Sequence, residues 1–355
     1  MTVDLAARSR LVIVADALTG GVGAVVKRQV EWFTERHWSV DVVSRESSAM
    51  APARSHIVQM PRTGLDALGV VRSGQTLRAI FKELRPSVIH CHGVRSFLIV
   101  RWAGAQAFVT NHGSGALPDE FPLHGMLRGA SLQLVPRLAI HAFSAAPDTP
   151  GPWHFVPHAS PNLRHLGRSP IGPRASIPTF LWLGRLEKQK KPELFVQAVA
   201  LAAGQCPIRG VVAGTGSLEG SLRLMARDLS APVEFLGEVR EVEPLIQQAW
   251  GVVLFSRFEA LTFAIQEAMW MGRAVVTSPL PSLRWLLGDG ALFASTLLEA
   301  QQALTFLCQP EIAASLGKKS AETIRRLIEP DMPWPVVEKT FERYRHPERR
   351  RDRPR

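Results

Sequence analysis

Two successive runs of alternating strand-like and helix-like segments constrain the fold of this chain more than any other feature of its 355 residues. Short stretches rich in aliphatic and β-branched residues alternate with stretches of helical periodicity, which is typical of parallel sheets joined by crossover helices. Leu77, Ile80, Phe81 and Leu84, for example, fall at i, i+3, i+4 and i+7, which predicts one apolar helix face. In the first run the predicted strands are 11–14, 39–44, 56–60, 87–90, 107–110 and 153–156.

A change in composition separates the two runs. Residues 168–178 are rich in Pro, Gly, Ser and Arg, and the strand pattern restarts directly after them. The second run predicts strands at 179–183, 208–212, 233–236, 252–255 and 274–277. We therefore predict an α/β chain with two doubly wound domains facing across a cleft, in which ligands bind at the carboxyl ends of the strands.

Cysteine content and hydropathy indicate the compartment. The three cysteines, Cys91, Cys206 and Cys308, are far apart and odd in number, which argues against a disulfide scaffold and fits a reducing environment. The apolar stretch 11–18 is too short for a signal peptide, and no stretch of about 18 apolar residues predicts a membrane-spanning helix. We expect a cytoplasmic protein, with peripheral association at the cytoplasmic face of a membrane as an additional expectation.

The charge balance of 42 basic to 31 acidic residues gives a net charge of +11. A field of this sign attracts phosphates of nucleotides, nucleic acids or anionic lipids alike. Part of the excess lies in the tail 347–355, which has no apolar periodicity and is predicted to be disordered. Two readings of the tail remain open, a solvated segment or a contact with anionic lipid headgroups.

Two glutamates spaced eight residues apart form the strongest local signal. Glu259 precedes a predicted helix and Glu267 lies within it, roughly on the same side of the element. The backbone N–H groups of Leu261, Thr262 and Phe263 would be free donors at the helix N-terminus, where a diphosphate can bind. A carboxylate nearby can accept hydrogen bonds from sugar or ribose hydroxyls. Two solvated glutamates on an amphipathic helix are the alternative reading of the spacing alone.

Cations and glycines follow the neighbouring strands. Arg185 and Lys190 come directly after the strand at 179–183, where fixed positive charges could neutralise a departing nucleotide diphosphate. Gly214 follows the strand at 208–212, and glycine lets the backbone approach a ligand, although such glycines also simply build strand-end turns.

The sequence around His90, Cys91 and His92 resembles a metal-binding motif. Neighbouring residues of a strand point to opposite faces, and no further clustered ligands complete a four-coordinate shell, so no metal site is predicted.

Taken together, these motifs resemble glycosyltransferase family four, whose members have the GT-B fold, and the resemblance covers nearly the whole chain. The matching segments keep order and spacing: the glycine loop 20–23, the Val-Ile-His-Cys-His strand end, Val-Thr-Asn-His-Gly at 109–113, Gly184-Arg-Leu with Lys190, Gly214-Thr-Gly, and the two glutamates. Trp334 and Tyr344 resemble the family's closing helix, which crosses back to the first domain. The resemblance implies domains at 1–168 and 179–329, a linker at 169–178, and a crossover helix region at 330–346.

The resemblance also implies a role for each residue. Arg185 and Lys190 would bind the diphosphate of a nucleotide sugar, and Glu267 would hold the ribose hydroxyls. Glu259 and the following amides would hold the donor sugar, and His112 would lie near the reacting carbon. From the first domain, the glycine loop with Gly21 and Gly23 would approach the phosphates. A histidine packed at a strand end is the alternative reading of His112.

The activity implied by the resemblance is hexosyl transfer that retains the anomeric configuration, without a metal ion, a covalent nucleophile or a cofactor beyond the donor itself. The acceptor would be a glycan or a lipid-linked glycan in surface polysaccharide or glycoconjugate assembly, and no nucleic acid partner is expected. Residues in the part of the first domain where family members shape the acceptor side are Trp102, Leu127, Arg128, Leu132, Leu134 and Arg137. This mixture of residues could rest on lipid headgroups, and ordinary core and surface residues are the alternative reading.

Three positions depart from the family pattern. Ala260-Leu-Thr replaces the frequent Gly-Phe-Gly, His158-Ala replaces Asn-Gly, and Trp285 stands where glutamate is common. These departures keep a second hypothesis open, a non-catalytic protein of the same fold that binds a partner, a glycan or nucleic acid through its basic surface.

Overall fold

The computed structural model of the chain describes residues 9–16, 18, 20–46, 50–61, 66–113, 122–166 and 175–345. These residues form two compact units, each built on a parallel sheet. The first unit contains the described residues up to Pro161 and those from Asp331 onward, and the second contains Asn162–Pro330. The predicted α/β class with two doubly wound parallel sheets is confirmed. Most of the expected linker and the expected basic tail lie outside the described residues.

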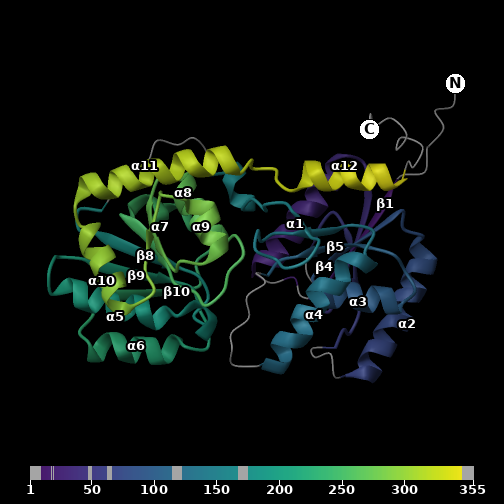
Figure 1. The fold of residues 1–355 in the computed structure, drawn as a ribbon, viewed down its shortest axis with the longest axis horizontal. Helices are drawn as coiled ribbons and strands as arrows, with labels where there is room; N and C mark the ends of the chain where they lie inside the picture. Colours follow the sequence, from purple (N-terminus) through teal and green to yellow (C-terminus); the bar gives the residue numbers. More distant parts are fainter. Residues whose placement is uncertain are drawn as a thin grey trace. The chain divides into compact units, whose positions relative to one another are not determined.

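The first unit has a seven-stranded parallel sheet in the order β3-β2-β1-β4-β5-β6-β7 (Figure 1). Its strands are β1 (Arg10–Ala15), β2 (Ser39–Ser44), β3 (Arg54–Ile57), β4 (Val88–His92), β5 (Phe108–Asn111), β6 (Ala142–Ser144) and β7 (His154–Phe155). Its helices are α1 (Gly20–Glu35), α2 (Ala67–Leu84), α3 (Val94–Trp102), α4 (Pro122–Leu138) and α12 (Trp334–Arg345). The central strand β1 is buried on both faces, which explains its continuous run of aliphatic residues.

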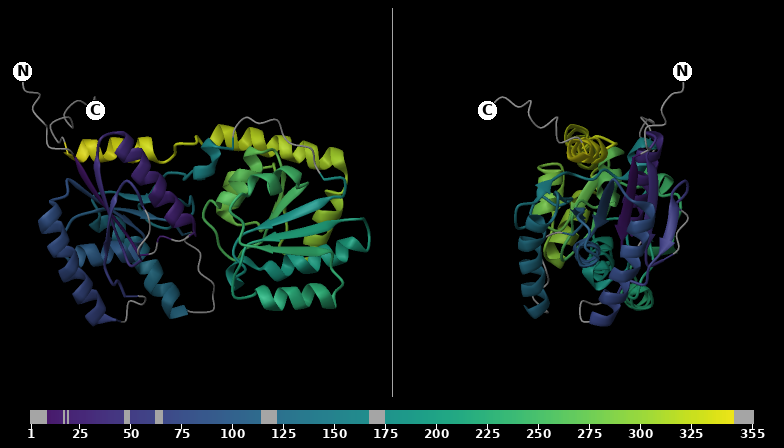
Figure 2. Two further views of the ribbon diagram at one scale, coloured as in Figure 1. Left: turned by 180° about the vertical axis from the view of Figure 1, so that it is seen from behind. Right: turned by 90° about the vertical axis from the view of Figure 1, so that its right-hand side faces the viewer.

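The second unit has a six-stranded parallel sheet in the order β10-β9-β8-β11-β12-β13. Its strands are β8 (Thr179–Leu183), β9 (Arg209–Ala213), β10 (Val233–Gly237), β11 (Gly251–Leu254), β12 (Ala274–Thr277) and β13 (Leu292–Phe293). Its helices are α5 (Pro192–Ala203), α6 (Glu219–Asp228), α7 (Glu243–Gln248), α8 (Phe263–Trp270), α9 (Pro281–Leu287), α10 (Leu297–Phe306) and α11 (Pro310–Leu327). Helices α5 and α6 lie on one side of this sheet and α11 on the other, as Figure 1 and the left view in Figure 2 show.

In both sheets the strand order reverses beside the first strand of the unit. The chain moves outward from β1 on one side and resumes at β4 on the other, and β8 and β11 have the same relationship in the second unit. Ligands of open parallel sheets bind outside the carboxyl ends of the strands at such a point. The loops after β1, β4, β8 and β11 are therefore the positions where functional side chains are expected.

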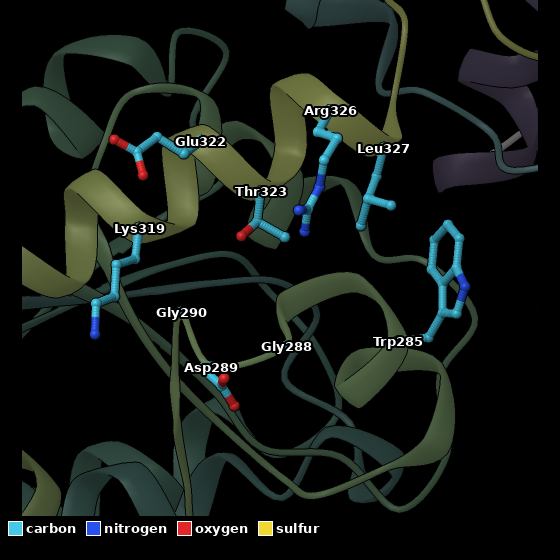
Figure 3. Close-up of a pocket in the computed structure, with 9 residues that line it drawn as sticks. All are labelled: Trp285, Gly288, Asp289, Gly290, Lys319, Glu322, Thr323, Arg326 and Leu327. Atoms are coloured by element: carbon cyan, nitrogen blue, oxygen red, sulfur yellow. The ribbon is translucent and has the colours of Figure 1, made fainter.

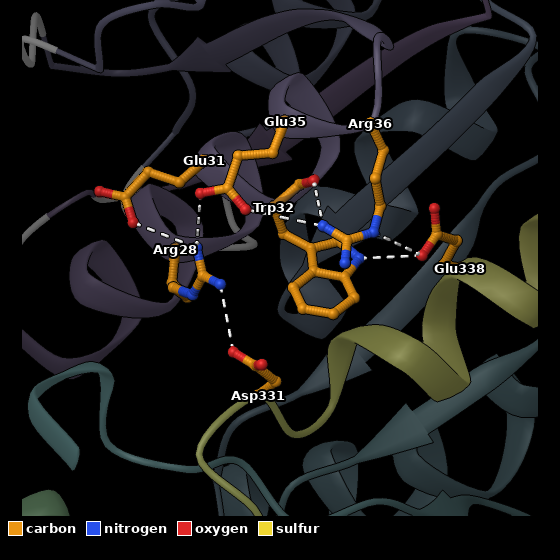
Figure 4. Close-up of polar contacts among 7 residues, drawn as sticks. All are labelled: Arg28, Glu31, Trp32, Glu35, Arg36, Asp331 and Glu338. Atoms are coloured by element: carbon orange, nitrogen blue, oxygen red, sulfur yellow. Dashed lines mark hydrogen bonds and ion pairs between the residues drawn. The ribbon is translucent and has the colours of Figure 1, made fainter. Parts of the chain in front are cut away.

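The last helix belongs to the first unit, because α12 packs on α1. The rings of Phe33 and Phe341 stack with their centroids 5.5 Å apart. Polar contacts surround this core: Arg28 is 3.2 Å from Asp331, and the Trp32 indole donates to Glu338 over 3.1 Å (Figure 4). Of the aromatic residues expected in the closing helix, Trp334 is buried, whereas Tyr344 packs its ring edge-on against Phe108 and remains partly exposed.

Within the described residues, the helices lack the length and apolar character that crossing a lipid bilayer requires.

Candidate functional site

The loops that follow β8 and β11 lie together at one edge of the second unit's sheet. The two strands are parallel neighbours, with Gly251 opposite Phe180 and Val253 opposite Trp182, so their carboxyl ends lie side by side. After β8 the chain forms a short 3-10 turn over Lys188–Lys190. Lys191 then adopts a left-handed conformation with φ 47°, and Pro192 begins α5 at a position that favours proline. This local geometry leads Lys190 back toward the loop after β11.

Lys190 and Glu259 form a buried ion pair across these two loops. The Lys190 ammonium donates to Oε1 of Glu259, and the side chains of both residues are only about a tenth exposed. The Ser256 hydroxyl donates to the same carboxylate over 2.6 Å. The Ser282 hydroxyl donates to the backbone carbonyl of Glu259 over 2.8 Å, which fixes the loop from the side of α9. The sequence predicted both residues as site residues, and the structure brings them into direct contact.

Arg185 belongs to the same loop as Lys190 but is exposed. Its guanidinium donates to the Gln189 side-chain oxygen over 3.2 Å. Gln189 in turn donates to the Phe258 carbonyl over 3.0 Å and accepts the Arg257 backbone N–H at its own carbonyl over 2.8 Å. Gln189 therefore holds the two loops together between the predicted cations and Glu259. Nothing in the sequence distinguished Gln189 from an ordinary surface residue.

Glu267 lies inside α8 and is 4% exposed. The Asn162 side chain donates to its Oε1 over 2.9 Å from the short 3-10 turn at Pro161–Arg164. Sequence reasoning missed Asn162 because it lies 105 positions from its partner. The first helical position, Phe263, follows Thr262, whose backbone is extended and whose side chain makes no capping hydrogen bond. The first backbone N–H groups of α8 have no acceptor within the helix, as at any helix N-terminus. Leu261, which directly precedes them, is buried.

Gly214 is required by contact between two loops of the second unit. Its φ is +143°, and a side chain at this position would place Cβ 2.0 Å from the Gly184 carbonyl oxygen. Gly216 meets the Leu186 carbonyl in the same way, at 2.4 Å. These glycines therefore let the loop after β9 pack directly on the loop after β8. Packing between the two loops is sufficient to require glycine at both positions, independently of any role in ligand binding.

The glycine loop of the first unit opens α1. Gly20 has a positive φ of 60°, and Gly21 is exposed in the first turn of the helix. A side chain on Gly23 would place Cβ 2.0 Å from the Leu18 carbonyl oxygen. Glycine is therefore required at this position because the backbone after β1 packs directly against α1. Gly20 and Gly21 are both exposed at the N-terminus of α1, where an anion can bind.

Four histidines gather on the face of the first sheet that α1 and α12 cover. We call His90, His92, His112 and His158 the histidine cluster. The rings of His92 and His112 stack with centroids 5.0 Å apart, and His158 meets His112 edge-on at 5.2 Å. His90 and His92 lie on the same face of β4 because they are two residues apart. The alternation of side chains along β4, which the sequence analysis used to reject a metal site, therefore separates only Cys91 from the two histidines.

Burial keeps the histidine cluster neutral. It lowers the pKa of His90 to about 3, with His112 as a second cause, and lowers the pKa of His112 to about 4. Burial also moves the pKa values of His92 and His158 well below the ordinary range, and the other histidines add to the effect. At neutral pH these imidazoles are hydrogen-bonding groups without charge. Across the described residues, no three or more His, Cys, Asp or Glu side chains are grouped so as to hold a metal ion.

A hollow of about 560 Å³ lies elsewhere on the second unit, between α11 and the loop after α9 (Figure 3). Trp285, Lys319 and Arg326 are among the residues that line it, and none of the predicted site residues does. Of the residues expected on the acceptor side, Leu132 is buried in the first unit, whereas Trp102 and Leu134 are more than half exposed. The side chains of Leu127 and Arg128 lie outside the described residues.

One curated protein sequence matches part of the chain. An alpha-1,4-N-acetyl-D-galactosaminyltransferase of Campylobacter jejuni, named for the substrate GalNAc-alpha-(1->4)-GalNAc-alpha-(1->3)-diNAcBac-PP-undecaprenol, is 33% identical over 92 residues. The match spans about a quarter of that relative's length, 26%, and 25% of this chain.

Comparison with solved structures supports the fold. Sucrose-phosphate synthase from Thermosynechococcus elongatus is similar with a TM-score of 0.73 at 16% identity, over 97% of this chain and 99% of that one. Anabaena Alr3699/HepE, solved in complex with UDP and glucose, is similar with a TM-score of 0.74 at 14% identity, over 94% and 100%.

Family profiles cover most of the chain. Residues 19–146 match Glycosyltransferase Family 4, and residues 177–318 match Glycosyl transferases group 1. Both units of the fold are thus accounted for, each by one profile. The chain belongs to the family-four glycosyltransferases and has their two-domain GT-B fold.

Proposed function

We propose that this protein transfers a hexosyl group from a nucleotide-diphosphate sugar to a glycan or lipid-linked acceptor, with retention of the anomeric configuration. The observation that carries the proposal is the contact between the loops after β8 and β11, which brings Lys190 against Glu259. Arg185 lies in the same loop as Lys190, and Glu267 lies in α8, the helix that follows the Glu259 loop. Such a set combines cations for a diphosphate with carboxylates for hydroxyl groups.

In the proposed complex, Arg185 and Lys190 neutralise the charge that develops on the departing diphosphate. Lys190 carries three N–H donors, so it can hold Glu259 and still donate to a phosphate oxygen. The exposed Arg185 guanidinium can swing from Gln189 to a ligand at the cost of one hydrogen bond. Fixed positive groups of this kind stabilise the transition state because they are oriented before the reaction begins.

The carboxylates and helix α8 bind the remaining parts of the donor. Glu267, oriented by Asn162, accepts hydrogen bonds from the ribose hydroxyls. Glu259 and the backbone N–H groups of Leu261, Thr262 and Phe263 hold the donor sugar. Gly214 lines the same edge of the second sheet, where its packing against Gly184 keeps the loop close to the strand ends.

The first unit supplies His112 beside the reacting carbon and the glycine loop with Gly21 and Gly23 near the phosphates. Retention follows from front-face departure of the diphosphate, with the acceptor hydroxyl entering on the same side. No metal ion, covalent nucleophile or cofactor other than the donor is part of this proposal. The protein acts by orienting the reactants and stabilising the leaving group.

A lipid-linked acceptor is supported by the exposed surface of α3 and α4. Leu98, Trp102, Leu134 and Leu138 are large apolar residues of these contacting helices, and all are more than 40% exposed. Arg137 is exposed beside Leu134 and Leu138 in the last turns of α4. Apolar side chains mixed with arginine suit the headgroup region of a membrane. The undecaprenol-linked substrate named for the Campylobacter jejuni relative is consistent with this acceptor class.

On this basis we assign the protein to surface polysaccharide or glycoconjugate assembly, in the cytoplasm and at the cytoplasmic face of the membrane. Nucleic acid is not a partner in this proposal.

A thermal-shift panel tests the donor assignment. The purified chain is mixed with UDP, GDP, UDP-glucose, UDP-galactose, UDP-N-acetylglucosamine, UDP-N-acetylgalactosamine and GDP-mannose, in parallel with Glu267→Ala. A selective rise in Tm, lost in the variant, is expected because a ligand that binds only the folded state stabilises it. Absence of any shift in a folded protein, together with salt-sensitive binding of polyanions, would favour the non-catalytic binding hypothesis instead.

A further inference from the structure

A single glutamine connects three members of the histidine cluster, His90, His92 and His112, through one chain of hydrogen bonds. The Gln29 side chain, on α1, has its nitrogen 2.8 Å from Nδ1 of His90 and its oxygen 2.7 Å from Nε2 of His92. The chain continues at both ends. Nε2 of His90 is 2.8 Å from the Thr110 hydroxyl, and Nδ1 of His92 is 2.7 Å from Nε2 of His112. Gln29 is fully buried.

The two ends of an amide fix the protons along this chain. The Gln29 nitrogen only donates, so Nδ1 of His90 must accept and its proton lies on Nε2, which donates to Thr110. The Gln29 oxygen only accepts, so His92 must carry its proton on Nε2. Nδ1 of His92 is then bare and accepts from Nε2–H of His112. The polarity of one amide thus sets three imidazole tautomers.

His112 is the residue at which this chain ends. Its Nε2 proton is committed to His92, so its other ring nitrogen, Nδ1, is a hydrogen-bond acceptor. Burial lowers the pKa of His112 to about 4, which agrees with a neutral ring at physiological pH. A neutral acceptor pairs with a hydroxyl or N–H donor and offers nothing to a phosphate oxygen, which itself accepts. The His112 ring is also held by edge-on contact with His158, whose ring centroid lies 6.1 Å from that of Trp334.

We propose that Gln29 is a positioning residue that holds His112 as the Nε2-protonated neutral tautomer, so that Nδ1 of His112 accepts a hydrogen bond from a hydroxyl of the substrate. The tautomer assignment stands on the first unit alone. Only the identity of the hydroxyl, as one of the donor sugar, rests on the proposed function. The inference therefore adds a specificity element, since a sugar without that hydroxyl loses its partner.

Side-chain ¹⁵N NMR of the full-length, ¹⁵N-histidine-labelled protein at pH 7 tests the proposal without any ligand. Protonated and bare ring nitrogens give well-separated signals, and His92→Gln and His112→Asn identify the two rings. We expect His112 to be protonated on Nε2 and bare on Nδ1. A wild-type His112 protonated on Nδ1, or doubly protonated, would overturn the proposal.

Two variants of Gln29 test its causal role. Gln29→Met keeps the length of the side chain but removes both polar atoms, so His112 is expected to populate both tautomers. Gln29→Glu keeps an acceptor for His92 and is expected to preserve the wild-type tautomer. Gln301→Met, which removes another buried glutamine in the second unit, is the matched control. An unchanged His112 spectrum in Gln29→Met would refute the role of Gln29. Gln29→Asn, whose shorter amide cannot reach both histidines, replaces Gln29→Met if that variant does not fold.

Kinetics separate this inference from the proposed function. With whichever donor of the thermal-shift panel is turned over, Gln29→Met should lower kcat/KM by about twofold if the two His112 tautomers are equally populated, and by about tenfold, the value of one well-oriented hydrogen bond, if the other tautomer dominates. Gln29→Glu should restore it. The deoxy analogue that lacks the recognised hydroxyl should show no such loss in Gln29→Met. If no donor is turned over while the His112 tautomer is as expected, the proposed function fails and the tautomer assignment stands. Equal losses with both donors would refute the hydroxyl contact.

Discussion

The Lys190 ammonium is paired with the Glu259 carboxylate, which joins the loop after β8 to the loop after β11 at the carboxyl edge of the second sheet. The pair is buried, and Ser256 donates a further hydrogen bond to the same carboxylate. Both residues are therefore expected to affect folding stability as well as turnover, and the two effects can be measured separately.

Lys190→Ala should lower turnover by a factor of about 10² to 10³, the cost of losing one preorganised group that stabilises the transition state. Removing one partner of a buried pair also costs roughly 3–5 kcal/mol in the free energy of unfolding, because the other charge stays buried. Urea unfolding of Lys190→Met, Glu259→Gln and the double variant measures this cost. The double variant should be clearly more stable than the sum of the single losses, and simple additivity would argue against the pair.

Asn162→Ala should weaken nucleotide binding through Glu267. Asn162 donates to the Glu267 carboxylate and fixes its orientation inside α8, so its removal should reduce affinity for the selected nucleotide by about tenfold, the value of one lost hydrogen bond. Isothermal titration with the nucleoside diphosphate measures the change. Asn162→Asp, which replaces the donor by a carboxylate beside Glu267, should weaken binding more. Unchanged affinity in both variants would remove Asn162 from the site.

The histidine cluster predicts loss of stability in mild acid. In the unfolded chain each imidazole binds a proton near pH 6.5, whereas burial holds the folded-state pKa at about 4 for His112 and about 3 for His90. The free energy of unfolding is therefore highest above pH 6.5 and decreases as the pH falls toward the folded-state pKa values. Each cluster histidine contributes a slope of about 1.4 kcal/mol per pH unit in this window.

Unfolding free energies measured at several pH values between 7.5 and 5 check this slope. His90→Gln should reduce it by about one proton equivalent. An equal slope in His90→Gln and the wild type would mean that His90 is protonated in the folded protein.

Cys206 and Cys308 should form a disulfide under oxidising conditions. They follow α5 and α10, which pack together, and their sulfur atoms lie 2.6 Å apart with both residues partly exposed. Oxidised glutathione should accept the two electrons and leave as two molecules of reduced glutathione after two thiol–disulfide exchanges. Thiol counting should then fall from three to one, since Cys91 is buried. Cys308→Ser should instead stop at a mixed disulfide or free thiol, and a full count of three after oxidation would contradict the pairing.

The central strands could be predicted from the sequence because they are buried on both faces. The predicted strands 39–44, 179–183 and 274–277 coincide with β2, β8 and β12, and 11–14 lies within β1. The predicted strand 56–60 is instead β3 at 54–57, an edge strand whose first residues, Arg54 and Ser55, carry no apolar signal. The strands β6 and β13, of three and two residues, were missed because they are too short to show alternation. The equally short β7 was predicted because it lies within the β-rich run Trp-His-Phe-Val at 153–156.

The residues of the candidate site were proposed from the sequence, but the contacts among them could not be. The spacing of Glu259 and Glu267 and the position of Lys190 after a strand are visible in the sequence. Their pairing across 69 positions depends on which strands are neighbours, and local patterns do not encode that. Gln29 reads as one polar residue of an amphipathic helix. Two histidines of β4 contact its amide, and the register of β4 and β5 brings His112 to one of them, His92.

The placement of α12 in the first unit determines the order in which the two units can be completed during synthesis. The chain emerges from the ribosome in sequence order, so Asn162–Pro330 leaves the exit tunnel before Asp331, Glu338 and Phe341 do. Until they appear, Phe33 and Trp32 on α1 lack the partners that cover them. A chain released from the ribosome before residue 331 was added would therefore have all the residues of the second unit, whereas its first unit would expose an open hydrophobic face, the kind of surface that chaperones recognise.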